Sequence, residues 1–389
     1  MGPRAVNTPS ASDPSSAGGV PRHLYDVDVV RLTTVLGVLG VHGTSLMLPS
    51  SELTGATLGL LHVTREVFLF LSAFVLAYSV RLPIRAGRFW RRRFPLVLAP
   101  YVLWSALYVL ADGGLDSPGS VLARYSRDLL SGAARFHLYF LLLTFQLYIV
   151  FPWVRSWVLR RRHHGRLLAA AVVWQLAFTS AIHFRLQFPA PLSTWLAHPG
   201  TWLPSYVLYV VAGILAAAHF DQVRAWVGAR ARLLGITALV VAVLGVTSYE
   251  LEVHVGHVSP LHAAEVFGPA VVIEAMAAIC AQFALGLWAA RRFGPRPLGL
   301  LRASSDVSFG VYLVHPLLYQ GFVAFLGAFG EDGGLGFLPE GAGLALLLVV
   351  IVPTTYLVAA TGIWVLRRTP FSLAVTGRRS ALPLQAPVT

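Results

Sequence analysis

Apolar runs long enough to cross a lipid bilayer recur along most of the chain. A transmembrane helix needs about 20 mainly apolar residues, and runs close to this length cover residues 27–48, 58–80, 94–111, 136–154, 167–183, 202–219, 233–249, 264–290, 306–328 and 342–366. The pattern predicts an all-α, polytopic membrane protein with about 10 transmembrane helices.

The two ends of the chain have a different composition. Residues 1–23 are rich in Pro, Ser, Gly and Ala and have no apolar core. They predict a disordered cytoplasmic tail and not a signal peptide. Residues 24–370 contain no polar insertion long enough for a second domain, so we expect one transmembrane domain. Residues 371–389 are expected to form a cytoplasmic C-terminal tail.

Arginines alternate between the loops that join the apolar runs. They gather in loops 81–93, 155–166, 220–232 and 291–305 and in the segment after 366, whereas there are none in loops 49–57, 250–263 and 329–341. Cytoplasmic loops of membrane proteins carry an excess of Lys and Arg. The alternation therefore predicts that both termini lie in the cytoplasm.

The composition supports a membrane protein. Charged residues make up 12% of the chain, about half of the fraction in soluble domains. The net charge of +13 comes from arginine alone, since the sequence has no lysine. Because the arginines lie in short loops, they indicate membrane topology and not a nucleic-acid partner. The single Cys280 excludes an intramolecular disulfide and a multi-cysteine metal site, and no metal is expected.

The first apolar run carries two ionisable side chains on one face, where their burial in a bilayer would cost free energy. Arg31 and His42 are eleven residues apart, which is roughly three helical turns and about 16 Å. Ionisable residues inside membrane helices are candidates for function, and imidazole is the commonest general base. The pair suggests a route for an elongated anionic ligand, with Asp28 placed one turn before Arg31 to orient its guanidinium.

Polar side chains in three other runs fall at comparable depth, and each has a structural alternative. Arg65 and Glu66 in the second run would also suit an interhelical ion pair or an interfacial pair that reaches water. Gln146 in the fourth run would suit an amide that bridges helices. His315, which precedes a proline in the ninth run, would suit a packed histidine. Several such residues at one depth predict a hydrated cavity.

Five motifs resemble the acyltransferase-3 family of integral membrane acyltransferases. They occur in the order Asp28-Val-Val-Arg31 with His42, Phe68-Leu-Phe-Leu-Ser-Ala-Phe74, Arg88 to Tyr101, His137-Leu-Tyr-Phe140 with Gln146, and Ser308-Phe-Gly-Val-Tyr-Leu-Val-His-Pro316. The match covers most of residues 25–370. The sequences around Thr64 to Phe68 and Pro100 to Tyr108 lean toward the branch that modifies exopolysaccharides.

The resemblance implies an acyltransferase that moves groups other than aminoacyl groups. Its donor is cytoplasmic acyl-coenzyme A, a co-substrate, and its acyl group is acetyl or succinyl. The acceptor is a hydroxyl of an exopolysaccharide, a cell-envelope glycan or a glycolipid at the outer face. The expected location is the bacterial plasma membrane, with polysaccharide synthesis or export proteins as partners.

The resemblance also assigns roles to individual residues. His42 would deprotonate the acceptor hydroxyl, and the oxyanion would take its hydrogen bond from Arg65, Tyr139 or His315. Coenzyme A would be held by Arg31, Asp28, Arg91, Arg92 and Arg93, and the acceptor by Glu66, Tyr139 and Gln146. Leu96 stands where many relatives have the second arginine of an Arg-x-x-Arg motif after Arg93, so the phosphate role does not transfer one to one.

Two other classes fit parts of the pattern. A transporter or flippase for a glycan or a lipid-linked intermediate would also need about ten helices with buried charge, although the sequence shows no internal repeat. A nonenzymatic scaffold of an export complex would give no reason for the pairing of Arg31 with His42 on one helix face.

Overall fold

The computed structural model describes residues 23–80, 83–113, 117–190, 193, 196, 198–327 and 334–380. These residues form helices, turns and loops, with no strand among them. Nine helices of the described part are long and apolar enough to cross a membrane, and a bent pair brings the number of candidate spans to ten. The all-α, polytopic prediction is confirmed. The tail expected at residues 1–23 lies almost wholly outside the described residues.

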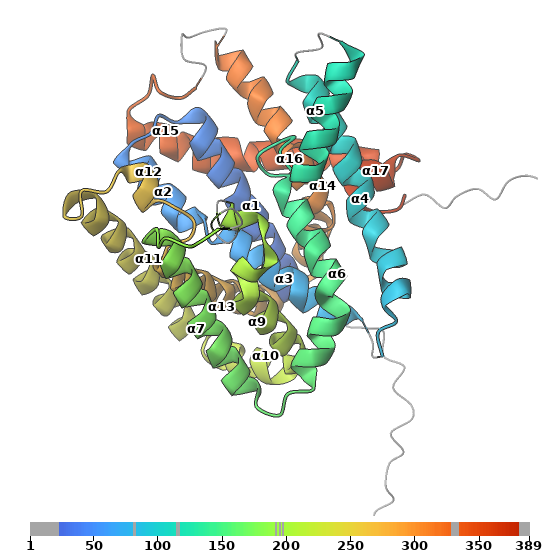
Figure 1. The fold of residues 1–389 in the computed structure, drawn as a ribbon, viewed down its shortest axis with the longest axis vertical. Coiled ribbons are helices and arrows are strands. Elements are labelled where there is room, and N and C mark those ends of the chain that lie inside the picture. Colours follow the sequence, from blue (N-terminus) through green and yellow to red (C-terminus); the bar gives the residue numbers. More distant parts are fainter. Residues whose placement is uncertain are drawn as a thin grey trace, which may run out of the picture.

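The spans follow one another with few additional elements (Figure 1). They are α1 (Tyr25–Met47), α2 (Glu52–Leu61) with α3 (Thr64–Ser79), α4 (Ala86–Ala111), α6 (Tyr139–Leu159), α7 (His164–His183), η2 (Leu203–Tyr206) and α9 (Val207–Ala218) with α10 (Phe220–Ala229), α11 (Ala231–His254), α13 (Pro269–Arg292), α14 (Pro295–Gly327), and α15 (Glu340–Leu346) with η3 (Leu347–Ile351) and α16 (Val352–Leu366). Shorter elements are α5 (Pro118–Ser131), η1 (Pro199–Thr201), α12 (Pro260–Ala263) and α17 (Ser372–Thr376).

Helix α1 lies at the centre of the bundle, in contact with α3, α13, α14 and α16 (Figure 1). Small residues on α1 allow these close approaches, as is usual between membrane helices. A Cβ atom on Gly37 would lie 2.6 Å from Thr64 Cγ2, and one on Gly43 would lie 2.8 Å from Leu347 Cδ1. Side chains on α1 therefore face several helices at once.

Several arginine-rich loops meet at one end of the bundle, which we call the arginine end, while Arg124 and Arg135 pair with Asp112 at the opposite end of α4. At the arginine end Arg155 donates to the carbonyl of Ala77 at 2.9 Å, and Arg224 lies 3.7 Å from the Asp26 carboxylate. At the opposite end the backbone N–H of Leu335 donates to the carbonyl of Met47 at 2.7 Å. The grouping agrees with the alternation of arginines in the sequence, while the orientation in the membrane stays a prediction.

Several boundaries differ from the expected ones because capping decides where a helix begins. Ser51 caps α2 by accepting from the N–H of Thr54, so this span begins at Glu52, six residues before the apolar run at 58–80. Gly268 precedes Pro269 at the first turn of α13, which delays the span expected from 264. The segment expected as a C-terminal tail contains α17, which packs on α4, α14 and α16.

Candidate active site

A cavity of about 200 Å³ lies beside the second half of α1. We call it the histidine cavity, because its polar lining consists of His42, His62, Thr64, Arg65, His137, Tyr139 and Tyr312. These residues come from α1, the break between α2 and α3, the start of α6 and the middle of α14. The fold thus brings four segments that are distant in the sequence to one cavity.

The ring of His42 packs on the ring of a second histidine, His315. The two ring centroids lie 5.2 Å apart, and the ring of His42 also contacts Phe136 at 4.5 Å. His315 is fully buried and is not among the lining residues of the histidine cavity. The predicted oxyanion donor His315 therefore lies next to His42 and not at the cavity wall.

A proline fixes the orientation of His315. Pro316 has no N–H, so the carbonyl of Tyr312, four residues earlier in α14, loses its helical donor. His315 Nδ1 lies 2.7 Å from this carbonyl oxygen. A carbonyl only accepts, so Nδ1 carries the hydrogen, and the uncharged ring has its lone pair at Nε2. The His-Pro sequence thus sets both the tautomer and the position of the ring beneath His42.

His137 completes a group of three histidines. It is buried, and its ring centroid lies 5.3 Å from that of His315 and 5.2 Å from that of Tyr312. Its backbone carbonyl accepts the hydroxyl of Tyr312. The sequence had placed His137 in a motif without giving it a role, because only the packing of α6 on α14 brings it to His42.

Arg65 reaches the histidine cavity as a fixed cation. Its Nη2 and Nε donate to Glu66 Oε1 at 3.0 and 3.3 Å, and its guanidinium lies over the rings of Phe267 and Tyr206 at 4.7 and 5.1 Å. Arg65 and Glu66 are neighbours within α3, so this ion pair is not the interhelical pair that the sequence offered as the structural alternative. Glu66 is buried and is not among the lining residues of the cavity.

A second cavity, of about 460 Å³, lies toward the arginine end. We call it the arginine cavity, because its lining includes Arg31, Arg93, Arg378 and Arg379. Arg31 Nη1 donates to Ser305 Oγ at 2.9 Å and lies 3.8 Å from Asp28 Oδ1. Asp28 therefore lies beside Arg31 as expected, although its hydrogen bond goes to His23.

The two cavities meet at three aromatic residues. Phe68, Phe140 and Tyr312 line both of them, with ring centroids 5.6 to 6.2 Å apart. We call these three residues the aromatic partition. Arg31 thus faces the cavity on one side of the partition and His42 the cavity on the other, so one face of α1 serves both.

Comparison with known proteins identifies the family of the chain. A family model described as an acyltransferase domain, Acyl_transf_3, matches residues 24–364. The chain belongs to the acyltransferase-3 family. No curated protein and no solved structure matches the chain. The resemblance of the five motifs is confirmed, the chain is a multi-pass membrane acyltransferase, and α17 with Arg378 and Arg379 lies beyond the matched residues.

Two of the remaining residues predicted to bind the acyl donor, Arg92 and Arg93, line a third cavity of this acyltransferase. It has about 590 Å³ and is lined by Arg85, Arg88, Arg92 and Arg93. Arg93 is shared with the arginine cavity and donates to Ser79 Oγ at 3.2 Å. Leu96, which departs from the family motif, lines the arginine cavity. Arg91 is in the lining of neither cavity.

Gln146 is used within the fold of the acyltransferase. Its Nε2 donates to the carbonyl of Thr201 at 2.7 Å, and its Oε1 accepts from the N–H of Leu203 at 3.0 Å. The amide thus joins α6 to the irregular segment before α9, and it is in the lining of neither the histidine nor the arginine cavity. The structure favours the bridging alternative for this predicted acceptor residue.

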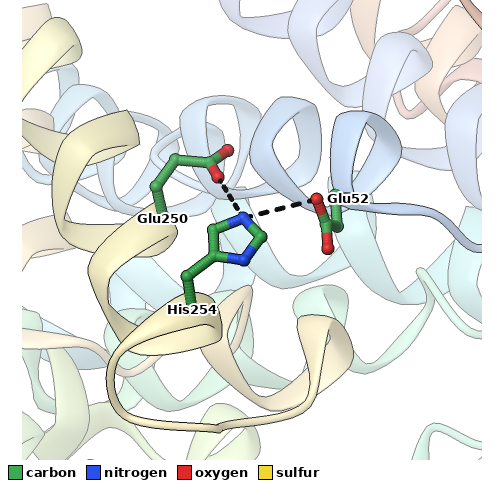
Figure 2. A group of neighbouring side chains, drawn as sticks. All are labelled: Glu52, Glu250 and His254. Atoms are coloured by element: carbon green, nitrogen blue, oxygen red, sulfur yellow. Dashed lines mark ion pairs between the residues drawn. The ribbon is translucent and has the colours of Figure 1, made fainter.

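One group of side chains on the described part of the acyltransferase has ligand atoms close enough for a metal ion: Glu52, Glu250 and His254. His254 Nε2 lies 3.1 Å from Glu250 and 3.5 Å from Glu52 (Figure 2). All three side chains are about half exposed, at the end opposite to the arginine end. The pair of His254 with Glu52 joins α2 to α11, and neither ion pair takes part in either cavity.

Proposed function

We propose that this acyltransferase moves an acetyl or succinyl group from acyl-coenzyme A to a hydroxyl of an exopolysaccharide, a cell-envelope glycan or a glycolipid. The observation that carries the proposal is the junction of two chemically different cavities at the aromatic partition. An anionic nucleotide suits the arginine cavity, and proton transfer suits the histidine cavity. A thioester that extends through the partition would join the two.

The arginine cavity supports a phosphate-bearing donor. Guanidinium groups bind phosphate oxygens in pairs of hydrogen bonds, and coenzyme A carries several phosphates. Arg31 and Arg93 hold the phosphates in this proposal, while Arg91 and Arg92 attract the nucleotide from the adjoining loop. The positive-inside rule predicts that these arginines lie in the cytoplasm, where acyl-coenzyme A would be available.

The histidine cavity supports the chemical step. His42 takes the proton of the acceptor hydroxyl, and the hydroxyl oxygen attacks the thioester carbonyl. Arg65 or Tyr139 donates to the oxyanion of the tetrahedral intermediate. When this intermediate collapses, the C–S bond breaks, the new C–O ester bond remains, and His42 returns the proton to the coenzyme A thiolate. His315 positions the ring of His42 in this scheme.

Acceptors enter the histidine cavity from the end opposite to the arginine end. Polysaccharide synthesis or export proteins would deliver a glycan to that side. Tyr139 lines the cavity and offers a hydroxyl to a sugar. The buried Glu66 acts through Arg65, whose guanidinium it holds in place.

Reconstituted vesicles test the proposal against transport. The purified chain receives acetyl- or succinyl-coenzyme A and envelope glycans from the source cells, and both thiol release and glycan acylation are measured. We expect acylation by the wild type and by His163→Ala, an exposed histidine outside both cavities, and none by His42→Ala. Scrambling of a glycolipid without acyl-coenzyme A, with no acylation by the wild type, would instead identify a flippase.

A further inference from the structure

The segment after α16 is docked on the bundle by specific contacts. We call residues 371–380 the C-terminal strap. Trp104 Nε1 of α4 donates to the carbonyl of Val375 at 3.0 Å. Ser372 is fully buried, and its hydroxyl donates to the carbonyl of Arg378 at 2.8 Å. Figure 1 shows α17 beside α4. The strap thus has a defined conformation against the membrane helices.

A glycine turns the strap toward the arginine cavity. Gly377 ends α17 in the left-handed conformation, with φ of +66°, which a residue with a Cβ atom rarely adopts. A Cβ atom at this position would also lie 2.5 Å from the carbonyl oxygen of Leu96 and 2.6 Å from the ring of Phe309. The turn brings Arg378 and Arg379 to the lining of the arginine cavity.

The strap makes the charge of this cavity more positive. Arg378 Nη1 lies 2.7 Å from Asp306 Oδ1, and Arg31 lies 3.8 Å from Asp28. Arg379 has no ion pair among the described residues. Two carboxylates thus accompany four guanidinium groups, so two positive charges remain. Like charges that share a cavity repel one another, and a polyanionic ligand would offset this repulsion.

We propose that the C-terminal strap forms part of the donor site, with Arg378 and Arg379 binding phosphates of acyl-coenzyme A. This rests on the proposed function, and it adds residues beyond the family match, which ends at residue 364. Arg31 and Arg93 hold one side of the nucleotide, and the strap closes the other. The family domain alone would leave this side of the arginine cavity open.

The test compares two donors in the full chain. Acetyl-coenzyme A carries the nucleotide phosphates, and acetyl-pantetheine lacks them. For Arg378→Gln/Arg379→Gln we expect the KM for acetyl-coenzyme A to rise about tenfold or more, with kcat and the KM for acetyl-pantetheine unchanged. Arg379→Gln alone keeps the ion pair of Arg378 with Asp306 and should give a smaller rise in the same KM.

The matched control removes two charges from the arginine end outside the cavity. Arg296 and Arg302 are exposed and are not among its lining residues, so Arg296→Gln/Arg302→Gln should leave both KM values unchanged. An equal loss with both donors in the strap variant would show a purely structural strap, and unchanged kinetics would show no role; either result overturns the proposal.

Calorimetry with coenzyme A separates this proposal from the proposed function. If the wild type binds coenzyme A but transfers no acyl group, the proposed function is wrong. The strap proposal is then tested by whether the strap variant has a higher Kd for coenzyme A than the wild type. If the wild type transfers acyl groups and the strap variant keeps the wild-type Kd, the strap proposal alone fails. A wild type that does not bind coenzyme A would overturn both.

Discussion

The arginine cavity and the histidine cavity share α1 and the aromatic partition but differ in their polar residues, which are mainly arginines in one and histidines in the other. The arginine cavity takes its arginines from near helix ends and from the C-terminal strap, where a charged group costs less free energy than in the membrane interior. The histidine cavity takes imidazoles from the second half of α1, the break between α2 and α3 and the start of α6, where burying a neutral ring costs less than burying a charge. The difference teaches that binding and chemistry can occupy successive depths along one helix.

Replacing His42 should cause the largest effect and separate the two cavities most clearly. In His42→Ala we expect kcat to fall by about 10²–10⁴-fold, because the general base is lost. The Kd for coenzyme A should stay the same, since Arg31 remains. Steady-state kinetics and calorimetry measure the two quantities; an intact kcat would remove His42 from the mechanism.

Replacing His315 tests whether the histidine of the His-Pro sequence positions the ring of His42. In His315→Leu we expect a loss in kcat of about 10²-fold, because a displaced reactive group costs this much, with the KM for the donor unchanged. His315→Asn places an amide N–H where Nδ1 stands and should recover part of the rate. Equal rates for the two variants would argue against a positioning role.

Replacing Arg31 tests the arginine cavity, on the other side of the aromatic partition. For Arg31→Gln we expect the Kd for coenzyme A to rise about tenfold, because a charge-assisted hydrogen bond to phosphate is lost. Turnover at saturating donor should remain close to that of the wild type. The opposite result, a normal Kd with a low kcat, would place Arg31 in the chemical step and remove the division between the cavities.

Gln146 should have the smallest effect on activity, since it borders neither cavity. Gln146→Leu removes two hydrogen bonds to backbone groups and should cost about 1–2 kcal/mol of stability. Thermal unfolding in detergent should show a lower Tm, while KM values for donor and acceptor stay unchanged. A raised acceptor KM with an unchanged Tm would restore its predicted role in substrate binding.

Local spacing explains what the sequence predicted well. The apolar lengths of the spans and the approach of Asp28 to Arg31 depend on the geometry of single helices. The grouping of His137 with His42 and His315 depends on packing between distant helices, which periodicity does not encode. The hydrogen bonds of Gln146 likewise depend on a loop that approaches from elsewhere.

The C-terminal strap shows a second limit. Its helix has only five residues, and its arginines looked like part of a charged tail. The signal was Gly377 next to Arg378 and Arg379, since a glycine after a short helix often marks a left-handed cap. Only the docking of Trp104 on Val375 shows where that turn points.

A structure of the wild type with a nonhydrolysable acetyl-coenzyme A analogue tests the division between the cavities most directly. We expect the phosphates at Arg31, Arg93 and the strap, the pantetheine arm across the aromatic partition, and the acyl carbonyl facing His42. A nucleotide bound in the histidine cavity, or an acyl group that stays on the arginine side of the partition, would contradict the division.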